Sequence, residues 1–181
     1  MTRCGWADSS PLMRDYHDLE WGRPIHDEAG LYERICLEGF QAGLSWATIL
    51  KKRPAFRAAF ADFDPELVAR FCDDRVEALL GDSAIVRHRG KIVAARTNAQ
   101  AVIALRGQEG LDELIWSFQP EAGPAPRTQA EVPTSSIESK NMAKALKARG
   151  FCFIGPTSAF ALMEAIGMVN THLADCHVRN G

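Results

Sequence analysis

The chain has 181 residues, of which 46% are hydrophobic and 24% are charged, and its net charge is −2. This length predicts one compact domain, or two small subdomains that share a core. The charge excludes a generally basic protein, so any surface that attracts nucleic acid must be local. No apolar stretch is long enough to span a membrane and no charged-then-apolar leader is visible, which predicts a cytoplasmic protein without a membrane partner.

The first predicted element of interest is an apolar helical run that contains Leu31, Ile35 and Glu38. Glu38 lies seven residues after Leu31 and three after Ile35, which places a carboxylate beside the apolar stripe of this helix. Glycine, glutamine and serine residues then interrupt the pattern, and Trp46 follows. A buried carboxylate is costly unless something pairs with it. The stretch LEGFQAGLSW (37–46) is therefore either a structural accident or part of a ligand site.

Further helix signals follow along the chain. The run KKR (51–53) reads as the basic last turn of a helix that ends before Pro54. Asp64 and Pro65 read as the N-cap and first residue of a new helix. Asp74 with Glu77, and Ser135 with Glu138, have the spacing of capping boxes.

Residues 83–102 predict a helix-hairpin-helix. One helix ends near Gly81, a tight turn follows, and a second helix begins near Gly90. Basic side chains gather at this turn, and amides at a helix N-terminus bind phosphate. The alternative is a solvated loop. The candidate phosphate-binding residues are Arg87, Arg89 and Lys91.

The C-terminal third contains the remaining signals. The proline-rich segment 120–133 is unpatterned and predicts a linker. Gly150 stands where a helix C-terminal glycine belongs, and FCFI (151–154) is the only strand-like segment. The prediction is an all-α fold in which residues 1–46 and 134–181 form one subdomain and residues 47–119 form the other.

The two ends of the chain hold candidate metal ligands. Five scattered cysteines make a disulfide framework improbable and leave thiols or metal ligands. His172 and Cys176 in HLADC have the i, i+4 spacing of one face of a helical turn. Cys4 and His17 near the N-terminus would complete a Cys₂His₂ set, the composition of a closed zinc site. Packing residues are the alternative for each, and His26 and His177 are competing ligands.

The N-terminal aromatic residues are the third constellation. Trp6, Tyr16 and Trp21 are predicted to face Glu38 and Trp46. Rings that stack on a flat heterocycle and a carboxylate that accepts its amino hydrogens make a pocket for a nucleobase. For any single tryptophan, a place in the core is the alternative.

Several stretches together identify a resemblance. They are CGW near the start, YHDLEWGRP (16–24), LEGFQAGLSWATILKKR (37–53), IVRHRGKI (85–92), and GMVNTH (167–172) followed by Cys176. In this order, over nearly the whole chain, they resemble the DNA-3-methyladenine glycosylase I family. The family implies an all-helical helix-hairpin-helix fold whose termini are joined through zinc held by Cys4, His17, His172 and Cys176.

The resemblance also implies roles in the pocket. Glu38 and Tyr16 match residues that hydrogen-bond methylated adenine, and Trp46 matches the ring that stacks on it. Gly43 and Leu44 match the tip that wedges into the duplex. Position 13, where the family leads us to expect a tyrosine, is Met13, whose thioether can still lie against a base.

The resemblance implies a monomeric base-excision repair enzyme that flips 3-methyladenine out of double-stranded alkylated DNA and hydrolyses its N-glycosidic bond, without lyase activity. Asp112, the nearest candidate for a downstream catalytic aspartate, is not expected to take part. Two alternatives remain: a non-catalytic module that binds alkylated DNA, and a zinc hydrolase, which would need an open coordination position.

Overall fold

A computed structural model describes residues 2–180 of the chain, and over this range it contains helices, turns and loops but no strand. The prediction of an all-α fold is confirmed, and the strand-like segment 151–154 is a loop. Short 3₁₀ turns cover Gly5–Ser9, Ala61–Phe63 and Gln129–Glu131. The α-helices of the described residues are α1 (Pro11–Leu19), α2 (Glu28–Gln41), α3 (Trp46–Ala59), α4 (Pro65–Ala69), α5 (Asp73–Gly81), α6 (Arg89–Leu105), α7 (Leu111–Trp116), α8 (Ile137–Ala148) and α9 (Pro156–Ala165).

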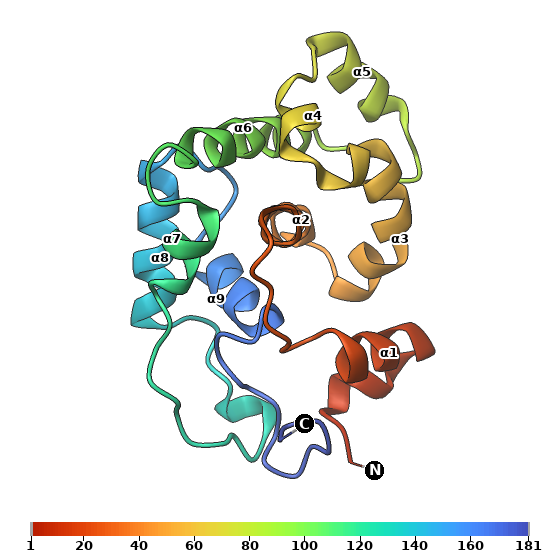
Figure 1. Cartoon of the computed structure of the whole chain (residues 1–181). Helices are drawn as coiled ribbons and strands as arrows, with labels where there is room; N and C mark the ends of the chain where they lie inside the picture. Colours follow the sequence, from red (N-terminus) through yellow and green to blue (C-terminus); the bar gives the residue numbers. More distant parts are fainter. Residues whose placement is uncertain (1, 181) are drawn as a thin grey trace.

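Helix α2 is the central element of the fold. Figure 1 views it nearly end-on, with α3 and α6 on two sides and α9 on another, and these contacts agree with the packing of side chains. Its residues Leu31, Ile35 and Phe40 are almost completely buried. The Tyr32 hydroxyl donates a 2.7 Å hydrogen bond to the Ala95 carbonyl of α6. A helix that is apolar on most of its circumference must be covered on most sides.

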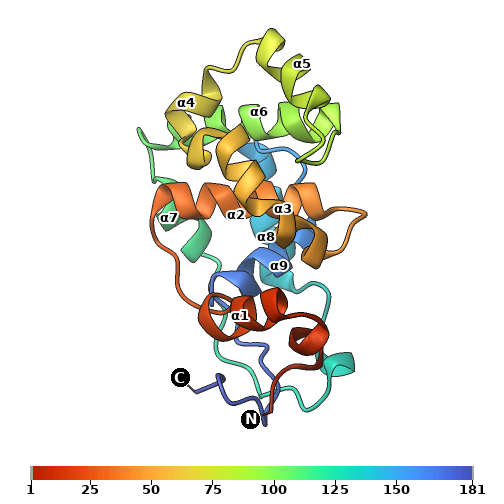
Figure 2. The ribbon, with the colours of Figure 1, turned by 90° about the vertical axis from the view of Figure 1, so that its right-hand side faces the viewer.

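The two ends of the chain lie side by side, below α1 in Figures 1 and 2. The end of α9 is fastened to the segment after α1, where the Gly22 amide donates to the Ala165 carbonyl at 3.2 Å. Gly167 has φ of +74°, and a Cβ at this position would lie 2.5 Å from the Gly22 carbonyl oxygen. Only glycine permits both the backbone angle and this close approach. The sequence thus joins its first and last helices through backbone contacts.

The helix starts were predicted with mixed success. Asp64 is the N-cap of α4 and its carboxylate accepts from the Glu66 amide at 2.8 Å, as predicted. The prediction for Asp74 is wrong: α5 begins at Asp73, and its N-cap residue makes no side-chain cap hydrogen bond. Two adjacent aspartates in the first turn both favour a helix start electrostatically, so the pattern alone does not fix which one is first.

The start of α8 is displaced by one residue from its prediction. The N-cap is Ser136 rather than Ser135, and Ser139 rather than Glu138 completes the capping box. The Ser139 hydroxyl accepts from the Ser136 amide at 2.9 Å, while the Ser136 hydroxyl accepts from the Ser139 amide at 3.1 Å. Gly150 follows the end of this helix with φ of +91°, as predicted.

Two further sequence-based predictions concern the end of a helix and the position of a linker. The prediction that a helix ends before Pro54 is wrong, since α3 runs through this proline to Ala59. The buried Phe56 of α3 shows why: the second half of the helix carries core side chains. The division into two subdomains with a linker over 120–133 stays a prediction. Among the described residues, no helix is long and apolar enough to cross a membrane.

Candidate functional site

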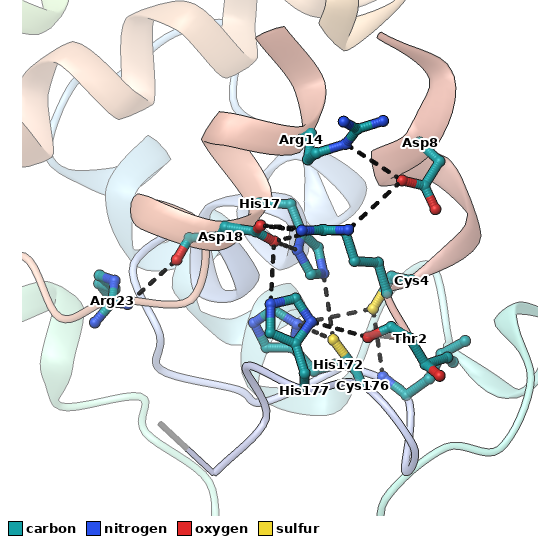
Figure 3. A network of polar contacts seen from close by, with 12 residues as sticks. Thr2, Cys4, Asp8, Arg14, His17, Asp18, Arg23, His172, Cys176 and His177 are labelled. Atoms are coloured by element: carbon teal, nitrogen blue, oxygen red, sulfur yellow. Dashed lines mark hydrogen bonds and ion pairs between the residues drawn. The ribbon is translucent and has the colours of Figure 1, made fainter. Parts of the chain in front are cut away.

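Four potential metal ligands meet where the chain ends meet. Cys4, His17, His172 and Cys176 are all buried, and one ligand atom from each lies within 4.8 Å of all the others. The Cys176 sulfur is 3.4 Å from His17 Nε2 and 3.5 Å from His172 Nδ1, and the Cys4 sulfur is 3.7 Å from His172 Nδ1 (Figure 3). The structure therefore brings together the four residues that the sequence indicated.

The geometry of this cluster fits a tetrahedral ion. With metal–sulfur bonds of about 2.3 Å and metal–nitrogen bonds of about 2.0 Å, a tetrahedron places neighbouring ligand atoms roughly 3.3–3.8 Å apart. Three of the six distances between ligand atoms lie in this range, and the other three are no longer than 4.8 Å. Four inward-facing sulfur and nitrogen donors make a site that is able to hold a metal ion.

Neighbouring groups orient the cluster. His17 Nδ1 lies 2.8 Å from the Asp18 carboxylate, which leaves Nε2 to face the other ligands. Arg3 holds that carboxylate with two nitrogens, and this pairing lowers the pKa of Asp18 far below its usual range. The Leu173 amide donates to the Cys4 sulfur at 3.4 Å.

The expected helical turn at HLADC is not present. Residues 172–176 form an irregular turn, closed by a hydrogen bond from the Cys176 amide to the Leu173 carbonyl at 2.9 Å. The turn still directs both ligands of this segment inward. Of the competing histidines, His177 bonds the Thr2 carbonyl, and His26 stacks on Trp116 and bonds Asp112. Neither contributes to the cluster.

A cavity of about 250 Å³ lies beside the metal cluster, between α1, α2, α3 and α9. Sites for drug-sized ligands span roughly 300–1,000 Å³, so this cavity suits one small ring system. Its wall holds the six residues that the sequence assigned to a pocket: Trp6, Met13, Tyr16, Trp21, Glu38 and Trp46. Met13 and Tyr16 pack together with Leu50 as a small apolar cluster separate from the main core.

Glu38 is the most unusual wall residue. Only 5% of it is exposed, and burial raises the pKa of its carboxyl to about 8. The nearby Arg34 cation opposes this rise, while the Glu164 carboxylate adds to it. Among the described residues, no hydrogen bond reaches this carboxyl group. Glu38 thus presents a buried, unpaired acceptor to the cavity.

Tyr16 is held by a chain of charged groups. Arg34 donates to the Tyr16 hydroxyl oxygen at 3.2 Å and to the Glu20 carboxylate at 3.1 Å, and Arg53 donates to the same carboxylate. Burial raises the pKa of Tyr16 well above its usual range, so the phenol keeps its proton. Because Arg34 uses a lone pair of the hydroxyl, the proton is left to donate elsewhere.

The aromatic rings stand around the cavity at steep angles. The Trp6 and Trp21 rings meet edge to face at 88°, with centroids 5.0 Å apart, and the Tyr16 and Trp46 centroids are 5.4 Å apart. The Trp46 Nε1 hydrogen is buried and has no acceptor among the described residues. Because protein atoms cover the Trp46 nitrogen completely, the Glu38 carboxyl, and not this indole, is the unpaired polar group that the cavity exposes.

Four wall residues were missed by sequence reasoning: Gln41, Gln129, Ala161 and Glu164. Glu164, on α9, accepts a 2.6 Å hydrogen bond from the Thr171 hydroxyl, and burial raises its pKa to about 7. A carboxylate in the helix that precedes GMVNTH was a visible signal. Gln129 comes from the predicted linker and carried no such signal.

The turn between α2 and α3 borders the cavity. Gly43 has φ of +82° and open space around it, and Leu44 is 43% exposed. Ser45 caps α3 by accepting from the Thr48 amide at 3.2 Å. We call residues 42–45 the wedge turn. It carries Leu44 at the surface, next to the glycine with a left-handed backbone.

The hairpin between α5 and α6 is present as predicted. The exposed Arg89 pairs with Glu77, with a nitrogen–oxygen distance of 2.7 Å. Arg87 is also exposed, and no hydrogen bond or ion pair within residues 2–180 involves its side chain. Lys52 of α3 donates to the Ser83 and Ala84 carbonyls at 3.0 Å and so holds the hairpin in place.

Lys91 does not lie where a surface phosphate contact would require. It is 8% exposed, and its ammonium group donates to the Phe40 carbonyl at 3.0 Å and the Ala42 carbonyl at 2.6 Å. Burial lowers its pKa. The expectation of an exposed cation is wrong here, because helix position 3 of α6 faces the end of α2. Lys91 instead fastens the hairpin to the wedge turn.

A helical fold with a base-sized aromatic cavity, a hairpin and a Cys₂His₂ cluster defines a nucleic-acid-binding protein that recognises a single base. The family described as methyladenine glycosylase matches residues 6–180. DNA-3-methyladenine glycosylase 1 of Escherichia coli strain K12 is 48% identical over 180 residues, covering 97% of this chain and 96% of that protein.

Solved structures agree with this match. A crystal structure of 3-methyladenine DNA glycosylase I superposes with a TM-score of 0.94 at 44% identity, over 97% of this chain and 98% of that one. A variant of such an enzyme, solved in complex with 3-methyladenine, superposes with a TM-score of 0.93 at 32% identity, over 100% and 99% of the two chains. The chain belongs to the methyladenine glycosylase family.

Proposed function

We propose that this protein is a base-excision repair glycosylase that removes 3-methyladenine from double-stranded alkylated DNA by hydrolysing the N-glycosidic bond, without lyase activity. The observation that carries the proposal is the unpaired, buried carboxyl group of Glu38 in an aromatic cavity. The names of the relatives support the substrate: two are 3-methyladenine glycosylases, and another is a complex with the base itself.

Recognition would use the Glu38 carboxyl, the Tyr16 hydroxyl and the aromatic rings. Glu38 accepts hydrogen bonds from the exocyclic amine of the flipped base, and Tyr16 donates its remaining proton to a ring nitrogen. Trp46 stacks on the base, while Trp6, Trp21 and Met13 close the wall. A stacked cation gains roughly 0.5–2 kcal/mol over a neutral ring from the tryptophan face. The pocket would thereby favour methylated adenine over adenine.

The chemistry follows from the charge of the substrate. Methylation at N3 makes the adenine of the nucleotide a cation, so its glycosidic bond is weakened before the enzyme binds. The protein then has to extrude the nucleotide, at a cost in unstacking that is lower for a damaged base. Gly43 and Leu44 of the wedge turn would fill the space that the nucleotide leaves. Arg87 and the free amides at the start of α6 would hold the phosphates.

We propose zinc as the ion of the Cys₂His₂ cluster. Two thiolates and two imidazoles are the donors that zinc prefers, and the ion would supply folding energy by joining the chain ends. Elemental analysis of protein purified without chelator should give one zinc per chain. A value near zero, with the protein still folded, would contradict this assignment.

Two alternatives are weighed against the proposal. A zinc hydrolase needs an open coordination position, whereas four buried protein ligands already complete a tetrahedron. A non-catalytic reader of alkylated DNA would have the same pocket and hairpin, and only an activity assay separates it. We also propose that the protein acts in the cytoplasm as a monomer, as the resemblance to the family implies.

The deciding experiment is release of free 3-methyladenine from methylated duplex DNA. The proposal predicts release by the parent and strongly reduced release by Glu38→Gln, which keeps the shape of the side chain. A chelator added during the assay should not stop the first turnovers, because the metal takes no part in the chemistry. If the parent binds the methylated duplex but releases no base, it is a reader. If the chelator abolishes release at once, the metal is catalytic.

A further inference from the structure

The loop between α8 and α9 exposes an aromatic side chain that none of the roles above uses. Phe153 is 46% exposed, whereas Phe151 and Ile154 beside it are buried. Its φ of +56° lies in the left-handed region, which is costly for a bulky residue. A chain that only needed to close this loop would place glycine or asparagine here.

The unusual backbone is held in place by a buried clamp. Asn98 of α6 is 2% exposed, and its side-chain amide donates to the Cys152 carbonyl at 3.1 Å. Its side-chain carbonyl accepts from the Cys152 amide at 2.7 Å. These two hydrogen bonds fix the loop along α6 (Figure 1). The conformation that turns the Phe153 ring outward is thus over-determined by its surroundings.

Phe153 lies between the two segments that the proposed function assigns to DNA contact. It meets the His88 ring edge to face, with centroids 6.0 Å apart and an angle of 74°. A Cβ on Gly90 would lie 3.2 Å from its Cζ atom, so glycine in the first turn of α6 makes room for it. On the other side, the Phe153 backbone lies against Gly39 of α2, two residues before the helix leads into the wedge turn.

We propose that Phe153 is a second apolar contact to the duplex: its exposed edge packs against sugars and base edges in the groove, beside the step that Leu44 opens. The proposal rests on the DNA face assigned under the proposed function. Continuity with that face identifies the occupant, because Phe153 touches the hairpin that faces the phosphates and the helix that carries the wedge. Proteins that bend DNA commonly use apolar side chains at such positions.

Three variants test this role. Phe153→Gly removes the ring and also relieves the left-handed backbone, whereas Phe153→Ala removes the ring and keeps the strain. Ile137→Ala, at an exposed apolar residue on α8 (72% exposed), is the matched control. The probe is a duplex with an uncharged abasic-site analogue, and each variant is also measured for thermal stability and for free 3-methyladenine affinity.

We expect Phe153→Gly and Phe153→Ala to weaken binding of the duplex about tenfold, the size of a lost aromatic contact to nucleic acid. The salt dependence should be unchanged, because an apolar contact releases no counterion. Phe153→Gly should melt at or above the temperature of Phe153→Ala, and base affinity should equal that of the parent.

Either of two results would overturn the inference. One is duplex affinity in Phe153→Gly equal to that of the parent. The other is a loss of duplex affinity that is accompanied by comparable losses of thermal stability and of base affinity. The ring would then stabilise the packing around α2 and would not contact DNA. The proposed function fails separately, if the parent releases no 3-methyladenine.

Discussion

The Cys₂His₂ cluster and the aromatic cavity both use residues of α1, and their buried polar groups differ in how completely they are paired. His17, in the cluster, has a partner for each ring nitrogen: the Asp18 carboxylate on one side and the Cys176 sulfur on the other. One residue earlier, Tyr16 faces a pocket where no hydrogen bond from residues 2–180 reaches the buried Glu38 carboxyl.

This difference separates stability from recognition. A buried polar group with all its partners stabilises one arrangement of the chain, whereas an unpaired one costs free energy until a ligand completes it. We infer that the cluster stabilises the fold. In the pocket, the substrate would supply the hydrogen-bond partner that Glu38 lacks. Four measurements test this difference between the cluster and the pocket.

The largest effect is expected from the cluster. Cys176→Ser should lower the free energy of unfolding by more than about 4 kcal/mol, since loss of a structural metal is among the most destabilising changes known. Base affinity should also fall, because Tyr16 is the neighbour of the ligand His17. Chemical denaturation compares it with Cys72→Ser, which alters an exposed cysteine outside the cluster. Equal stability of the two variants would remove the cluster from its structural role.

The next effect is a pH dependence of stability that originates in the pocket. The pKa of Glu38 is about 8 in the folded chain against an ordinary value of 4.5. Between these values the folded state holds a proton that the unfolded state has lost, so stability falls as pH rises, by at most about 1.4 kcal/mol per pH unit.

Glu38→Gln removes this titration. Relative to the parent, the variant should therefore gain stability steadily from pH 5 to pH 8. Denaturation curves of both proteins at these two pH values give the difference in the free energy of unfolding that Glu38, together with its interaction with Glu164, causes. A constant difference between the two would mean that Glu38 titrates normally and that the pocket carries no unpaired carboxyl.

Glu38→Gln should gain stability relative to the parent, but its affinity for the free base should fall. Glu38→Gln loses the acceptor that faces the exocyclic amine and adds a donor against it, so free 3-methyladenine should bind more weakly by roughly 1–3 kcal/mol, the cost of leaving a buried polar group without its partner. Calorimetry, or quenching of tryptophan fluorescence, measures the affinity of both proteins for the free base. Duplex binding through the hairpin should be nearly unchanged. A variant that binds and excises the base like the parent would make Glu38 a structural residue.

The smallest effect is expected at the hairpin, where the structure separates two cations that look alike in sequence. Arg87→Ala should make the slope of log affinity against log salt shallower by about 0.9, the share of one phosphate. Lys91→Met should leave the slope unchanged and lower stability, because the Phe40 and Ala42 carbonyls lose their donor. If Lys91→Met changed the slope and Arg87→Ala did not, the Lys91 ammonium would have to leave its two carbonyl partners and contact a phosphate when DNA binds.

Local sequence signals determined a large part of this protein. The period of the apolar residues and the scarcity of strand patterns predict the all-α fold. Asp64 predicts a helix start, because its carboxylate caps residues only two positions away. Glu38 was placed beside the apolar stripe of α2 by helical spacing alone. The ordered motifs from CGW to GMVNTH carried the family and with it the ligand set at the two chain ends.

Tertiary structure decided which side chains face each other across elements. Lys91 and Arg87 belong to one basic run, but Lys91 turns inward because the end of α2 offers it two carbonyls 49 and 51 residues earlier in the chain. Gln129 enters the pocket wall from a segment that has no pattern of its own. Phe153 turns outward because Asn98, on another helix, clamps its neighbour Cys152. Helix periodicity and capping act over a few residues and can be read from the sequence, whereas these contacts depend on how the helices assemble.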